Sequence, residues 1–89
     1  MNINFKGDER MLINMKRPRL EKVRVCGWEY KVATSIGVAY SKEINEKEVQ
    51  ILVYSNEKPY LRIHFADTPT PNDLIAIGEE LKKLEETEE

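Results

Sequence analysis

Cys26 and His64 are the only cysteine and the only histidine among the 89 residues of this chain. They form the one pair that could act as nucleophile and base. Cys26 stands beside Gly27 in what reads as a tight turn, His64 stands on a predicted strand, and no third residue near them is spaced to orient the histidine. We therefore expect neither residue to be catalytic, and we expect no enzymatic activity.

The remaining candidates for chemistry are carboxylates. Glutamates cluster at residues 43–48, 79–80 and 85–89, which read as a loop, a helix exterior and a tail, and such charge runs are typical of solvated surfaces. Asp67 and His64 could share one weakly held metal ion, but a single histidine and a single carboxylate do not make a specific site. One cysteine excludes an internal disulfide and a multi-cysteine zinc site. We expect no metal and no cofactor.

Aromatic and basic side chains form the most informative set. Alternation along residues 60–65 places Tyr60, Arg62 and His64 on one side of a strand, and Tyr54 precedes them. If neighbouring strands pair in the simple order, the basic residues earlier in the chain lie on or near the same face. The candidate partner-binding residues are Tyr54, Tyr60, Arg62, His64, Lys22, Arg24, Lys31, Lys16, Arg17 and Arg19.

Three interpretations of this face remain open: a solvated surface, a protein interface, and a platform for single-stranded DNA or RNA. Tyrosine and arginine are frequent anchors of protein interfaces. Rings on an open sheet can also stack on bases while cations neutralise phosphates. The net charge of −2 argues against tight non-specific binding of nucleic acid. We expect a protein-binding module or inhibitor, of the compact kind that phages encode, with single-stranded nucleic-acid binding as the alternative.

The helix that ends the predicted fold is the clearest element. Thr70 is typical of an N-cap, Pro71 of a first helical position, and Asp73 stands three residues after the cap. Leu74, Ile77, Leu81 and Leu84 then recur at helical spacing, with Gly78 beside this apolar stripe as a point of close approach. The pattern predicts a helix over residues 71–85.

Two hairpins are predicted before that helix. Residues 49–54 and 60–65 are rich in β-branched and aromatic residues and flank a loop of hairpin length. Upstream, residues 23–25 and 28–40 alternate on either side of Cys26 and Gly27, which predicts a second hairpin with a bulge or bend near Gly37. The predicted core between sheet and helix is Trp28, Val32, Ile36, Val53 or Leu52, Ile63, Phe65, Leu74, Ile77 and Leu81.

The whole chain reads as one domain because it has 89 residues. A composition of 40% hydrophobic and 34% charged residues is ordinary for a globular protein. The predicted fold class is α+β: an antiparallel sheet of four to six strands with one C-terminal helix packed on one face. Residues 1–20 read as an extra hairpin or an arm, residues 21–66 as the sheet, and residues 86–89 as a frayed acidic tail. One helix covers only part of such a sheet, which predicts a homodimer.

Charge and hydropathy add two expectations. Residues 1–31 carry eight basic and four acidic side chains, whereas residues 32–89 carry six and twelve. This asymmetry fits either a basic contact surface or attraction between the two parts of one fold. No apolar run is long enough to span a bilayer, and the first residues lack the features of a secretion signal. We expect a cytoplasmic protein that does not contact membranes.

Overall fold

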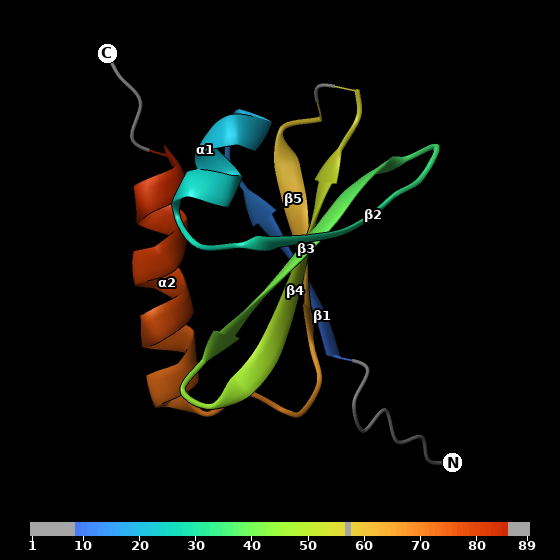
Figure 1. Cartoon of the computed structure of the whole chain (residues 1–89). Coiled ribbons are helices and arrows are strands. Elements are labelled where there is room, and N and C mark those ends of the chain that lie inside the picture. Colours follow the sequence, from blue (N-terminus) through green and yellow to red (C-terminus); the bar gives the residue numbers. More distant parts are fainter. Residues whose placement is uncertain (1–8, 57, 86–89) are drawn as a thin grey trace.

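The computed structural model describes residues 9–56 and 58–85 of the chain. Its elements are β1 (Glu9–Asn14), α1 (Leu20–Val25), β2 (Glu29–Ala33), β3 (Gly37–Ile44), β4 (Lys47–Tyr54), β5 (Tyr60–Phe65) and α2 (Pro71–Glu85). The five strands form one antiparallel sheet in the order β1-β5-β4-β3-β2. Figure 1 shows both helices on the same side of this sheet. The predicted α+β fold class, the range of strand number and the C-terminal helix are confirmed.

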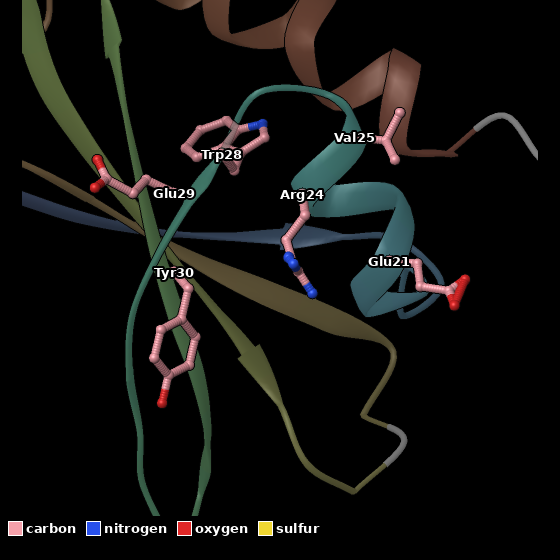
Figure 2. Close-up of a pocket in the computed structure, with 6 residues that line it drawn as sticks. All are labelled: Glu21, Arg24, Val25, Trp28, Glu29 and Tyr30. Carbon is pink, nitrogen blue, oxygen red and sulfur yellow. The ribbon is translucent and has the colours of Figure 1, made fainter.

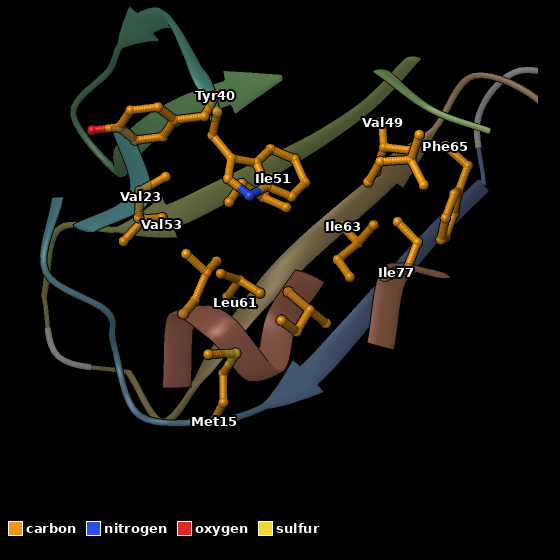
Figure 3. Close-up of a cluster of buried hydrophobic side chains, with 14 residues drawn as sticks. Met15, Val23, Tyr40, Val49, Ile51, Val53, Leu61, Ile63, Phe65 and Ile77 are labelled. Atoms are coloured by element: carbon orange, nitrogen blue, oxygen red, sulfur yellow. The ribbon is translucent and has the colours of Figure 1, made fainter. Parts of the chain in front are cut away.

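The core lies between the helices and one face of the sheet (Figure 3). Strands β4 and β5 alternate as predicted: Ile51 pairs with Ile63 and both are buried, whereas Arg62 beside them is half-buried on the other side. Burial of one face of each strand accounts for the strict period of two in their sequences. The rest of the core comes chiefly from Val23, Trp28, Tyr40, Val49, Val53, Leu61, Phe65, Ile77, Leu81 and Leu84.

Helix α2 has the predicted bounds, and its N-terminus is capped as predicted. The backbone N–H of Asp73 donates to Thr70 Oγ1 (3.1 Å), and the backbone N–H of Thr70 donates to Asp73 Oδ2 (3.0 Å). Aspartate thus completes a capping box in the place of the more common glutamate. Asp73 also accepts hydrogen bonds from the side chains of Asn45 (2.9 Å) and Lys47 (2.8 Å), so the β3–β4 hairpin holds the start of α2.

Two details of α2 differ from the prediction. Leu74, expected in the core, is 41% exposed, because it lies in the first turn, beside the end of the apolar stripe. Gly78 does not permit a close approach, since a Cβ atom there would meet nothing within 4 Å. The buried stripe of the helix is therefore Ile77, Leu81 and Leu84.

The segment before β2 forms a short helix, so the predicted hairpin around Cys26 and Gly27 is wrong. Gly27 ends α1 with φ of 99°. Its backbone N–H donates to Arg24 O (3.0 Å), and the backbone N–H of Trp28 donates to Val23 O (3.2 Å). These two bonds form a Schellman motif, in which a left-handed glycine closes a helix. Val23 and Trp28 are both buried, which is the apolar contact that commonly accompanies this motif.

The predicted single strand over residues 28–40 is also wrong, because a tight turn divides it into β2 and β3. The backbone N–H of Thr34 donates to Gly37 O (2.7 Å), and the backbone N–H of Gly37 donates back to Thr34 Oγ1 (3.2 Å). Gly37 then begins β3 very close to β4, where a Cβ atom would lie 2.5 Å from Val53 O. Thr34 and Gly37 therefore reverse the chain at a place where the apolar alternation suggests continuity.

Burial does not alternate along this hairpin as expected. All five residues of β2 are exposed. The bend expected near Gly37 is present as the turn at residues 34–37, whereas the register of β2 against β3 shifts between Tyr30 and Val32. Val32 and Ile36, predicted to lie in the core, are 50% and 53% exposed. A shift of one residue moves every later side chain to the opposite face, so the even positions do not stay together.

At the other edge of the sheet, β1 corresponds to the second half of the hairpin considered for residues 1–20. It pairs with β5, with Met11 opposite Ile63, and ends at Asn14, before Pro18. The first half of that predicted hairpin and the acidic tail at 86–89 lie outside the described residues.

Candidate functional site

We call the side of the sheet that faces away from α2 the outer face. One row of paired residues crosses it from edge to edge: Leu12 on β1, Arg62 on β5, Leu52 on β4, Ala39 on β3 and Val32 on β2. Leu12 and Val32, at its two ends, are 58% and 50% exposed. Within residues 9–56 and 58–85 no helix lies over this row. We call it the outer-face strip; it is apolar apart from one arginine.

Two tyrosines lie at one end of β4 and β5, beside the outer-face strip. The rings of Tyr54 and Tyr60 meet edge to face, with centroids 5.3 Å apart and planes at 83°. The Lys58 ammonium lies 5.7 Å from the first centroid and 5.8 Å from the second. Both rings are therefore held in place by contacts within the chain.

His64 lies on the other side of the strip. It pairs in register with Arg10 on β1 and with Gln50 on β4. Together with Gln50 and Glu48 it lines a shallow hollow of about 170 Å³. Tyr54, Tyr60, Arg62 and His64 are thus more exposed than Leu61, Ile63 and Phe65, as the alternation predicts.

Of the basic members of the predicted set, Arg62 lies on the outer face, whereas those at residues 16–24 do not. Lys22 and Arg24 belong to α1 rather than to a strand, so they lie on the helix side of the sheet. The preceding cations line a hollow of about 260 Å³ against the end of α2, formed by Lys16, Arg17, Pro18, Arg19, Lys22, Leu84 and Glu85. Arg17 is tied down there by a hydrogen bond from its Nε to Tyr54 O (2.7 Å). Lys31 is exposed on β2, at the register shift.

The structure does not bring Cys26 and His64 together. Cys26 is a free thiol that follows α1 and packs against the core on the helix side. His64 lies on the outer face of β5, on the opposite side of the sheet. Glu43 and Glu48, expected in a loop, lie opposite each other on β3 and β4.

A further concavity, unanticipated from the sequence, lies between α1 and β2 (Figure 2). It is open, has a volume of about 750 Å³, and is lined by Glu21, Arg24, Val25, Trp28, Glu29 and Tyr30. We call it the α1–β2 hollow. Val25 and Tyr30 are 84% and 54% exposed there, whereas Trp28 is buried. The Trp28 indole N–H has no acceptor among the described residues, and Figure 2 shows it directed toward the α1–β2 connection, away from Tyr30.

Lys42 on β3 connects the residues around this hollow with α2. Its ammonium donates to Cys26 O (2.8 Å) and to Glu80 Oε1 on α2 (2.8 Å), and it lies 6.0 Å from the centroid of the Trp28 ring. Burial alone raises the pKa of Glu80, but the hydrogen bond and the charge of Lys42, with that of Lys83, outweigh burial and lower it. One lysine therefore joins the end of α1, the start of β2 and the middle of α2.

Two signals in the sequence could have revealed the α1–β2 hollow. Pro18, the apolar spacing of Leu20 and Val23, and Gly27 together form the start, face and stop of a short helix. Thr34 and Gly37 are turn residues inside the long alternating run. Both signals are weaker than the alternation of the seven even positions from Trp28 to Tyr40, which favours a strand. Neither signal shows that α1 lies next to β2.

No helix among residues 9–56 and 58–85 has the length and apolar character needed to pass through a bilayer. The same residues contain no group of three or more His, Cys, Asp or Glu side chains placed to hold a metal ion. No family model, no curated protein and no solved structure matches this chain.

Proposed function

We propose that this chain is a small non-enzymatic domain, a binding module or an inhibitor, that attaches to another protein through its outer face. The observation that supports the proposal is the outer-face strip, whose ends Leu12 and Val32 are half or more exposed. Leu52 in the middle of the strip is only 9% exposed, so the exposed apolar surface lies at the two ends, on a sheet face that no helix of the described chain covers. An inhibitor of the compact kind that phages encode would bind in the same way.

The residues beside the strip suit a protein partner. Tyrosine and arginine are enriched among the residues that dominate interface energies. Tyr54 and Tyr60 are held by each other and by Lys58, so they lose little conformational entropy when a partner covers them. Arg62 lies inside the strip, where a partner would surround it.

A protein partner is favoured over single-stranded nucleic acid because the cations are divided between two sides of the sheet. Affinity for nucleic acid comes mainly from phosphate neutralisation. The cations from Lys16 to Arg24 lie on the helix side, and Arg17 there is already engaged by a hydrogen bond from its Nε to Tyr54 O (2.7 Å). Lys58 already lies over both tyrosine rings, where a base would have to stack.

The experiment is site-specific photo-cross-linking in an extract of the native host. A photoreactive phenylalanine analogue replaces Leu12 or Tyr60 on the outer face, and Lys82 on the exposed side of α2 as the control. We expect one protein to cross-link from positions 12 and 60 and not from position 82. Arg62→Glu in the position-12 variant is expected to weaken that cross-link at least about tenfold, without changing the circular dichroism spectrum.

Two outcomes would refute this assignment. Cross-links to nucleic acid alone would indicate the alternative function, binding of single-stranded DNA or RNA. Protein cross-links that survive Arg62→Glu, or that form equally from position 82, would move the interface away from the outer face.

The homodimer predicted from the sequence remains a proposal, and a second copy would compete with the partner protein for the same strip. A second copy that covers Leu12 and Val32 would bury the most exposed apolar side chains of the outer face. Light scattering at micromolar concentrations is expected to show a dimer that Leu12→Lys converts to a monomer. A monomer at all these concentrations would exclude it.

A further inference from the structure

Strand β2 is an open edge of the sheet. It pairs with β3 on one side and is last in the strand order of the described chain, and all five of its residues are exposed. Backbone N–H and C=O groups on such an edge are available to another extended chain. The edge runs beside the α1–β2 hollow, which Trp28 and Tyr30 line from the β2 side.

One cation and two carboxylates line the α1–β2 hollow, and the cation is the charged group that extends into it. In Figure 2 the Arg24 side chain extends into the space between α1 and Tyr30, whereas Glu21 and Glu29 point away from it to opposite sides. The Arg24 guanidinium makes no hydrogen bond or ion pair with any residue in the ranges 9–56 and 58–85. Apolar surface from Val25 and Tyr30 flanks this cation.

We propose that an extended acidic segment of a partner protein adds to β2 as a sixth strand, with its carboxylate on Arg24 and its apolar side chains in the α1–β2 hollow. Strand addition beside a helix supplies backbone hydrogen bonds for affinity and side-chain contacts for specificity. Alternate residues of the added strand face the hollow, so a carboxylate and an apolar residue two positions away can both reach it.

A flexible peptide fits this edge better than a second copy of the chain does. The register shift between Tyr30 and Val32 increases the local twist of β2. A peptide can follow that twist, whereas a second β2 would bring an equal irregularity of its own. This site lies on the helix side and is separate from the outer-face strip.

The probe is the peptide Thr-Val-Thr-Glu-Thr-Val-Thr, which places valine, glutamate and valine on one side of a strand. Trp28, the one tryptophan of the chain, lines the hollow and reports binding through its fluorescence. Two control peptides accompany it: one with lysine in place of glutamate, and one with every backbone nitrogen methylated, which cannot donate a backbone hydrogen bond to β2 in either orientation.

We expect the acidic peptide to bind the full chain at least about tenfold more tightly than either control peptide. Arg24→Glu is expected to remove this preference and to bind the lysine peptide more tightly than the acidic one. Binding of the lysine peptide would also show that the variant is folded. Lys82→Glu, a charge reversal on the exposed side of α2, should leave Kd unchanged.

Three results would overturn the inference: no binding of the acidic peptide up to about 1 mM, equal binding of the methylated peptide, or unchanged binding after Arg24→Glu. A dimer that is lost when β2 is mutated would assign the edge to a second copy instead. Arg62→Glu should leave peptide binding intact, so failure of the outer-face proposal is distinguishable from failure here.

Discussion

Helix α2 and the α1–β2 segment are held in different ways. Helix α2 has 15 residues, a reciprocal capping box and three buried aliphatic side chains. Helix α1 has six residues, one buried side chain and no side-chain cap at Arg19. A helix of that length is unstable alone. Helix α1 therefore depends on the Gly27 motif that ends it and on Lys42, which links Cys26 O to Glu80 of α2. The more firmly held helix supports the fold, while the less firmly held one borders the hollow for which we propose a peptide ligand.

The largest expected effect comes from the α2 side of this comparison. Leu81→Ala and Ile63→Ala remove buried side chains from facing layers of the core, so each is expected to lower the free energy of unfolding by about 2–5 kcal/mol. Ile75→Ala, at a position that is 62% exposed on the same helix, is the matched control and should change it by less than about 0.5 kcal/mol. Chemical denaturation measures all three. Equal stability of Leu81→Ala and Ile75→Ala would contradict the placement of α2.

A smaller effect is expected from the link between the two regions. Lys42→Met keeps the apolar stem but removes the ammonium that joins Cys26 O to Glu80, so we expect a loss of about 1–3 kcal/mol. Hydrogen exchange should show faster opening of α1 than of α2, because α1 loses its external support. Lys83→Met, whose ammonium lies farther from the same carboxylate (3.6 Å) and is mostly exposed, is the control. Equal loss of protection in both helices would show that α1 is not separately held.

A pH-dependent effect is expected at the start of α2. Hydrogen bonds from Lys47, from the Thr70 backbone and from Asn45 hold the pKa of Asp73 well below its ordinary value of 3.8. A carboxyl whose pKa is lowered by folding adds stability above its unfolded pKa and loses it as pH falls toward the folded value. The melting temperature should therefore decrease as the pH is lowered below about 4. Asp73→Asn should make this decrease shallower. An unchanged slope in Asp73→Asn would exclude this carboxyl as the cause.

The smallest effect is expected at Cys26. Cys26→Ser should lower the free energy of unfolding by about 1 kcal/mol or less and leave partner binding unchanged, because Lys42 contacts the Cys26 backbone oxygen and not its thiol. Denaturation and the cross-linking assay at position 12 measure both. Loss of binding without unfolding would give the thiol a role that its position does not indicate.

Capping residues and period-two alternation predicted the elements in which the apolar positions of the pattern are the buried ones. Thr70 and Asp73 predicted the start of α2, and the alternation of Leu61, Ile63 and Phe65 predicted which face of β5 is buried. The same alternation separated Tyr60, Arg62 and His64 from the core. These predictions hold because each depends on contacts within a few residues or on one face of one strand.

Sequence patterns alone were enough for the fold class, α2, β4, β5 and the side of β5 that carries Tyr60, Arg62 and His64. Only the tertiary structure decided that residues 20–25 form a helix and that β2 is an open edge beside it. The run from Trp28 to Tyr40 alternates as one strand would, yet Thr34 and Gly37 turn it because Gly37 must pass close to β4. Its apolar residues alternate whether they face the core or solvent. Period alone therefore cannot locate the turn, the exposed edge or the hollow beside it.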